Sequence, residues 1–131
     1  MDFNSISEFS QRELPYNLEA EQTILGALLI DPDVLTTVME YIKPESFYNG
    51  QHRELFGIII RMFSVGVNAD IITVLNEAVD QGIFETSAAG KSYLTNIMQG
   101  VPTVSNIESY CKIVEEKFYI RSLVIAAREI I

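Results

Sequence analysis

The sequence is poor in the residues on which disulfides, metal centres and secretion depend. Its 131 residues include one cysteine, one histidine and no tryptophan. Cys111 cannot form a disulfide within the chain, and residues 1–5 lack the basic segment and apolar core of a secretory signal. These absences exclude a disulfide-stabilised secreted domain and predict a cytoplasmic protein.

Basic residues are also scarce. There are 9 lysines and arginines against 18 aspartates and glutamates, which gives a net charge of −9. Affinity for DNA or RNA rests largely on basic side chains that displace counterions from phosphates, so a domain this acidic is expected to bind nucleic acid poorly. The charge balance favours proteins as partners.

No stretch is apolar enough to cross a membrane. The longest segment without charge, Ser92–Ile107, contains asparagine, glutamine and proline and falls short of the roughly 20 apolar residues that a spanning helix needs. Hydrophobic residues nevertheless make up 48% of the chain and charged residues 21%, which is typical of a globular protein rather than a disordered one. The length and composition predict one folded domain.

Strand patterns are absent as well, because no run alternates apolar and polar residues between hairpin turns. Apolar residues recur instead at intervals of three and four, which predicts an all-α fold with about six helices. Residues 1–14 show no such period and are expected to form a mobile tail. The predicted helices cover residues 18–30, 32 to about 41, 51–63, 71 to about 81, about 93–99 and 106–131, with Asn17, Asp31 and Asp70 as caps and Gly66, Gly82 and Gly100 as ends.

Two features of these helices bear on packing. Gly26, in the middle of the first helix, costs about 1 kcal/mol relative to alanine and indicates that a neighbouring helix crosses closely there. The last dozen residues carry apolar side chains around much of the helix circumference. Such a helix is expected to be buried on several sides, either as the core helix of this domain or against another subunit or a continuation of the chain. The lack of a cap after Glu129 favours the second alternative.

One segment resembles part of a phosphate-binding loop. Gly90-Lys91-Ser92 matches the end of the Walker A pattern, but Glu85 stands where the loop needs its first glycine, and no apolar strand precedes it. We interpret Gly90 as the start of a helix and Lys91 as a solvated charge. The segment therefore predicts no nucleotide site.

The remaining candidates for chemistry are isolated. His52 and Cys111 lack the spacing of metal ligands, so we interpret His52 as held by local hydrogen bonds or exposed, and Cys111 as a buried apolar residue. Carboxylate pairs such as Glu19 and Glu21 are expected to be solvated. The sequence predicts no catalytic, cofactor or metal site in this chain.

Several short motifs follow one another in an informative order. One is Lys43-Pro44-Glu45-Ser46-Phe47-Tyr48, followed by His52 and Phe56. The others are Leu14–Gln22, Leu25–Pro32, Asp70–Val74, Gly90 with Tyr93 and Leu94, Val101–Thr103, Asn106–Tyr110 and Ile113–Val114. Each is weak alone, but together they cover about residues 14–131. In this order and spacing the chain resembles the N-terminal domain of bacterial DnaB-type replicative DNA helicases.

The resemblance implies a compact helical head over residues 15–118 and the start of a C-terminal helical hairpin over residues 119–131, with the chain ending before a linker and a RecA-like ATPase motor. It implies no enzyme activity and no cofactor for this chain, whereas the full-length parent would be an ATP-dependent replicative helicase that uses ATP and Mg. In the family, these domains pair through the hairpin to build a collar above a hexameric motor and dock the helicase-binding domain of primase. The implied partners are primase, other helicase subunits and a helicase loader or initiator in the bacterial cytoplasm.

The resemblance also places primase contacts in particular segments. It predicts Tyr93, Val124 and Ile130 as partner-binding residues and Leu123 and Ile131 as oligomerisation residues. Two other functions stay open: a helicase-binding adaptor of the primase type, which has a similar helical fold, and a helical DNA-binding module. Strongly salt-dependent binding to single-stranded DNA would favour the last of these.

Overall fold

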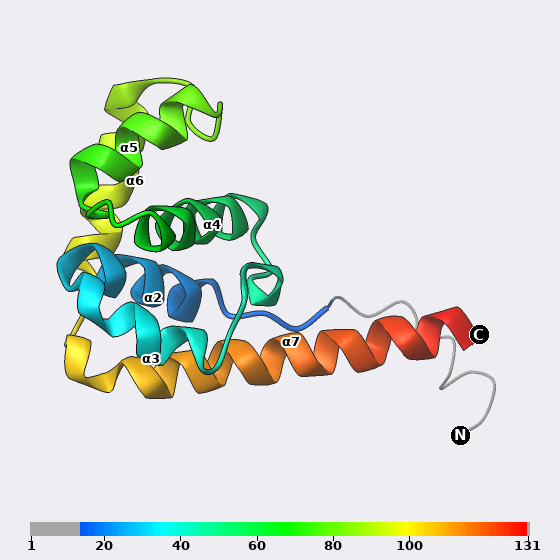
Figure 1. Cartoon of the computed structure of the whole chain (residues 1–131). Helices are drawn as coiled ribbons and strands as arrows, with labels where there is room; N and C mark the ends of the chain where they lie inside the picture. The colour runs from blue at the N-terminus through cyan, green and yellow to red at the C-terminus, as the bar shows by residue number, and fades with distance from the viewer. Residues whose placement is uncertain (1–13, 131) are drawn as a thin grey trace.

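The fold of the domain is entirely helical over residues 14–130, which are the residues that the structure, a computed structural model, describes. Within this range there are six α-helices, three short 3₁₀ turns and no strand, so the all-α prediction is confirmed (Figure 1). The predicted tail lies outside the described residues except for Leu14. The helices are α2 (Leu18–Ile30), α3 (Leu35–Met39), α4 (Gly50–Ser64), α5 (Ile71–Asp80), α6 (Ser87–Gln99) and α7 (Ile107–Ile130), and the 3₁₀ turns are Pro32–Val34, Pro44–Ser46 and Val104–Asn106.

Most helix ends follow from local chemistry. The Asn17 Oδ1 atom accepts a hydrogen bond of 2.9 Å from the backbone N–H of Ala20, and Asp70 Oδ1 accepts one of 2.8 Å from Thr73. These carboxamide and carboxylate caps satisfy N–H groups that have no partner within the helix. After α4 and α5 the chain turns at Gly66 and Gly82, whose φ values of 75° and 76° lie in the left-handed region. The predicted caps and glycine ends are confirmed at these positions.

The start of α6 differs from the prediction. The helix begins at Ser87 rather than near Tyr93, because Thr86 Oγ1 accepts a 3.1 Å hydrogen bond from the N–H of Ala89 and caps it there. Gly90 therefore lies inside the helix and does not mark its start. A Cβ atom at Gly90 would lie 2.6 Å from side-chain atoms of Leu75 and Phe84. The glycine allows α6 to pack closely against α5 and the loop that follows it.

The core is built around α2. Its residues from Ala20 to Leu29 are buried except Gln22, and the helix contacts α4, α6 and α7. A Cβ atom at Gly26 would meet the backbone carbonyl of Ile97 and lie 2.8 Å from Val101 Cγ2. The predicted close helix crossing at Gly26 is confirmed, and the helix that crosses there is α6.

The longest helix, α7, lies along one side of this core. Figure 1 shows its N-terminal half beside α2 and α3 and its C-terminal half extending past the head, while α5 and α6 form the opposite end of the molecule. Cys111 in the N-terminal half is completely buried, as predicted. The predicted division at residue 118 falls inside this one continuous helix and remains a prediction. No helix among residues 14–130 is long and apolar enough to cross a membrane.

Candidate functional site

The C-terminal half of α7 exposes a row of apolar side chains. Tyr119, Leu123 and Ile130 are 63%, 53% and 87% exposed, and Ala126 between them is exposed too. Intervals of four, three and four residues place these side chains on one face of the helix, with the spacing of a helix–helix seam. The interpretation of this segment as a core helix of the domain is therefore wrong, because in this chain the row is open to solvent.

The same side of α7 is charged nearer its start. Glu108, Lys112 and Glu115 are all exposed there, and they lie on the face that becomes apolar from Tyr119 onward. Charged side chains are the usual solvated surface of a helix, whereas exposed apolar rows mark contact with another protein surface. The outward face of α7 thus changes from charged to apolar at Tyr119.

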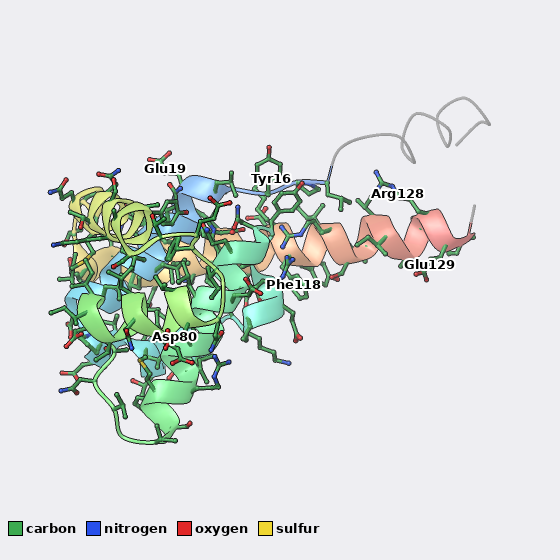
Figure 2. The ribbon with its side chains drawn as sticks, turned by 90° about the horizontal axis from the view of Figure 1, so that it is seen from above. Tyr16, Glu19, Asp80, Phe118, Arg128 and Glu129 are labelled. Atoms are coloured by element: carbon green, nitrogen blue, oxygen red, sulfur yellow. The ribbon has the colours of Figure 1, made fainter. Side chains whose placement is uncertain are left out.

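The head-facing side of α7 carries a different row. It consists of Val114, Phe118, Arg121 and Ile125, which recur at the same intervals. Val114 and Arg121 are buried, Phe118 is half-buried and Ile125 is 44% exposed. Figure 2 shows Phe118 at the edge of the head, and Arg128 and Glu129 on opposite sides of the extended part of α7. Beyond Arg121 no residue of α7 up to Ile130 is fully buried.

Arg121 attaches α7 to the head. Its side chain is 6% exposed, and Nη1 and Nη2 donate hydrogen bonds of 2.9 Å and 2.7 Å to the carbonyl oxygens of Pro15 and Ser46. The guanidinium carbon lies 5.4 Å from the ring centre of Tyr48 and 5.8 Å from that of Phe118, as cation–π contacts require. Burial lowers the pKa of Arg121, but an arginine keeps its charge in a protein. This one side chain joins α7 to the segment before α2 and to the turn before α4.

A second polar cluster lies inside the head. Glu21 on α2 and His52 on α4 are each 1% exposed, and Glu21 Oε1 lies 2.8 Å from His52 Nδ1. The other ring nitrogen, Nε2, lies 2.5 Å from the hydroxyl of Tyr93 on α6. Glu21 also accepts backbone N–H bonds of 2.8 Å from Tyr48 and 3.3 Å from Asn49. The carboxylate is therefore fully satisfied by its neighbours.

This cluster acts as a cross-link between three helices. A neutral imidazole that donates from Nδ1 to the carboxylate can accept the Tyr93 hydroxyl proton at Nε2, so each polar atom finds a partner. Burial raises the pKa of Tyr93, which keeps its phenol protonated as the donor. Carboxylate, imidazole and hydroxyl follow the order of a hydrolase triad, but both Glu21 and His52 are closed off from solvent and substrate. The arrangement supports a structural role.

Two sequence interpretations are corrected here. His52 is neither exposed nor held locally, because its side-chain partners lie 31 and 41 residues away in the chain. Glu21 is buried rather than solvated. The sequence did carry a signal for both charged residues, because each lies at helical spacing within an apolar face. Glu21 precedes Ile24 and Leu28 on such a face, and Arg121 follows Val114 and Phe118. A charge in such a position is buried with partners or not at all.

The predicted contact residues fall in two places. Leu123, Val124 and Ile130 lie together on the extended part of α7, with Val124 half-buried and the other two exposed. Tyr93 lies apart from them on α6, where its hydroxyl is held by His52 and by Gln22. A cavity of about 340 Å³ opens beside its ring, so Tyr93 lines a concave surface of the head. Ile131 lies outside the described residues.

Comparison with known proteins agrees with this architecture. Residues 13–116 match the family model described as DnaB-like helicase N terminal domain. The chain is 40% identical over 116 residues to the replicative DNA helicase DnaC of Bacillus subtilis, which is 88% of this chain and 25% of that protein. It is 38% identical over 122 residues to the replicative DNA helicase DnaB of Geobacillus stearothermophilus, or 93% of this chain and 27% of that protein.

The fold matches a solved structure equally well. The crystal structure of the N-terminal domain of DnaB helicase from Mycobacterium tuberculosis superimposes with a TM-score of 0.83 and 33% sequence identity, covering 90% of this chain and 85% of that one. The chain spans about a quarter of the length of the curated relatives it matches. The family resemblance in the ordered motifs is confirmed, and the chain belongs to the DnaB-like helicase N-terminal domain family.

Proposed function

We propose that this domain is the assembly and docking module of a replicative DNA helicase. In the whole protein it would form part of a collar above the motor, support hexamer assembly and bind the helicase-binding domain of primase. The observation that carries the proposal is the apolar row Tyr119, Leu123, Ala126 and Ile130, which is exposed on a helix that extends beyond the head. An exposed apolar row of this kind favours a protein surface as its partner.

The alternatives have less support. The relatives named above are replicative helicases, which favours the helicase side over an adaptor of the primase type. A DNA-binding module would need a basic face, and the net charge of −9 argues against one. The proposed start of the hairpin at residue 119 agrees with the position at which the outward face of α7 becomes apolar.

The activity of the whole protein is part of the same proposal. Its relatives' names support an ATP-dependent DNA helicase in the bacterial cytoplasm, with ATP and Mg bound by the motor. This domain would contribute no ATP hydrolysis of its own, since Gly90-Lys91-Ser92 lacks the rest of a phosphate loop. A helicase loader or initiator is a further expected partner.

Calorimetric titration tests primase docking. We expect saturable binding of the 131-residue chain to the C-terminal helicase-binding domain of the cognate primase, and no binding to single-stranded DNA in a parallel titration. Val124→Asp and Ile130→Asp should weaken the primase affinity at least tenfold, about 1.4 kcal/mol, with the circular dichroism spectrum unchanged. Ile72→Asp is the matched control, because Ile72 is 75% exposed on α5 at the other end of the molecule.

Assembly is tested by sedimentation. A chain extended beyond Ile131 should self-associate, and Leu123→Asp should weaken this association whereas Ile72→Asp should not. If neither primase binding nor self-association occurs in the extended chain, the docking function is wrong. Salt-dependent binding to single-stranded DNA with no binding to primase would favour the DNA-binding module instead.

A further inference from the structure

A small cleft lies beside Arg121 at the point where α7 leaves the head. It encloses about 280 Å³ between the turn before α4 and residues 118–125 of α7. Apolar side chains form much of its wall, two arginines, Arg53 and Arg121, lie beside them, and Glu45, Tyr48 and Ser122 complete the lining. The apolar side chains are Leu14, Phe47, Phe118 and Ile125. The cleft thus combines apolar walls with two positive charges.

Both guanidinium groups are held in place by carbonyl oxygens. Arg53 Nη1 donates hydrogen bonds of 2.9 Å to the carbonyls of Phe47 and Tyr48, much as Arg121 binds those of Pro15 and Ser46. No carboxylate of residues 14–130 forms an ion pair with either guanidinium. Arg53 is exposed, so its other N–H groups remain accessible.

The nearby carboxylates leave this positive charge largely uncompensated. Glu21 attracts Arg121 through space, but its oxygens are bound to His52 and to two backbone N–H groups. Glu45 lines the rim of the cleft and is itself exposed to water, which screens its charge. In a domain with a net charge of −9, this cleft would attract an anion locally, with the exposed Arg53 as its donor and the buried Arg121 adding positive charge.

We propose that this cleft binds a peptide segment of a partner protein in which a carboxylate stands next to an aliphatic or aromatic side chain. A guanidinium matches a carboxylate through two parallel N–H···O bonds, and the apolar walls match the neighbouring side chain. The volume suits one or two side chains rather than a larger ligand. This inference rests on the proposed docking function and supplies the chemistry of one contact.

The surroundings favour a peptide over a nucleotide. The Tyr48 ring lines the cleft 5.4 Å from the guanidinium carbon of Arg121, and a base that stacked there would need one of its faces. Tyr16 already stacks on that ring at 4.3 Å with an interplanar angle of 13°, and Arg121 lies over it as well. The cleft also continues onto the extended part of α7 through Ser122 and Ile125. Ser122 lies one helical turn before Ala126 of the apolar row, so a protein chain that covers Ala126 would also reach the rim of the cleft.

An NMR titration of the ¹⁵N-labelled 131-residue chain tests the proposal with small probes. N-acetyl-leucine carries a carboxylate beside an aliphatic side chain, N-acetyl-leucinamide lacks the charge, and inorganic phosphate lacks the side chain. We expect saturable shifts of the Tyr48, Ser122 and Ile125 amide signals with N-acetyl-leucine, in the millimolar range of so small a ligand. The amide and phosphate should bind at least fivefold more weakly.

Two matched variants identify the site. Arg53→Gln should weaken N-acetyl-leucine binding at least fivefold while the remaining spectrum stays that of the folded chain. Arg61→Gln removes the same charge from an exposed position on the same helix that does not line the cleft, and should leave binding unchanged. Equal binding of N-acetyl-leucine by Arg53→Gln, or no shifts in the wild-type chain, would overturn the proposal.

Phosphate that binds as tightly as N-acetyl-leucine would also overturn it, because the cleft would then be a general anion site. Failure of this inference is distinguishable from failure of the docking function. The primase titration and the sedimentation of the extended chain report on α7 without the probe. If the chain binds primase but not N-acetyl-leucine, docking would be limited to the apolar row.

Discussion

Arg121 Nη2 donates a hydrogen bond of 2.7 Å to the carbonyl oxygen of Ser46, although the two residues are 75 positions apart in the chain. Nη1 of the same side chain binds the carbonyl of Pro15, 106 positions away. Together these bonds tie the middle of α7 to the segment before α2 and to the turn before α4, in addition to the packing of its N-terminal half against α2 and α3. One buried charge thus helps to hold the helix that carries the apolar row.

Replacing this arginine tests its role. Arg121→Met keeps much of the side-chain volume but leaves the buried carbonyl of Ser46 and the part-buried carbonyl of Pro15 without their donor, so we expect a loss of about 2–4 kcal/mol in the free energy of unfolding. Urea denaturation followed by circular dichroism measures the loss. Lys112→Met on the exposed side of α7 is the control and should change stability by less than about 0.5 kcal/mol. Equal effects of the two substitutions would contradict the anchoring role.

The buried carboxylate of Glu21 gives a second prediction. Glu21→Gln preserves the shape of the side chain but replaces one acceptor oxygen with an NH₂ group, which would face a donor N–H or the imidazole. We expect a loss of about 2–4 kcal/mol, measured by urea denaturation. Glu19→Gln, two residues earlier on the same helix and exposed, should have little effect. A Glu21→Gln protein as stable as Glu19→Gln would show that the network does not stabilise the fold.

Local chemistry accounts for much of what the sequence predicted. Asn17 and Asp70 cap their helices and Gly66 and Gly82 end them, because these features depend on residues within one turn. The start of α6 was predicted six residues too late. Glycine has a low helix propensity, so Gly90 was not expected inside a helix. The structure places it there because the close contact with Leu75 and Phe84 requires a residue without a side chain.

Long-range pairing could not be predicted. Glu21, His52 and Tyr93 come from three helices, and no local spacing indicates that they meet. The apolar circumference at the end of α7 was recognised, but whether it is core or interface depends on how far the head extends along the helix. Only the three-dimensional arrangement shows that Arg121 is the last fully buried residue of α7 among the described residues.

Alanine substitution is expected to have opposite effects on stability at two helical glycines, one inside the close contact between α2 and α6 and one outside it. Gly26→Ala would place a Cβ against the Ile97 carbonyl and Val101, and because backbone cannot yield easily, we expect a loss of about 1–3 kcal/mol. Gly57→Ala on α4 would meet only Arg61 Nη1 at 3.6 Å, an ordinary contact, and should gain up to about 1 kcal/mol of stability from helix propensity. Thermal unfolding of the two variants distinguishes them. A stabilising Gly26→Ala substitution would disprove the tight crossing.

The thiol of Cys111 predicts how stability changes at alkaline pH. Burial, and then the charges of Glu108 and Glu115, raise its pKa from 9.0 to about 12. The folded state therefore holds the thiol proton more tightly than the unfolded state does. This contribution to stability is fully present below about pH 9 and is lost as the pH rises toward 12.

Urea denaturation of wild type and Cys111→Ala between pH 8 and 11 isolates the contribution of the thiol, because the other titrating groups are common to both proteins. The stability advantage of the wild type over Cys111→Ala should fall steadily above pH 9, and an advantage that stays constant to pH 11 would show that the thiol ionises as easily in the folded chain as in the unfolded one.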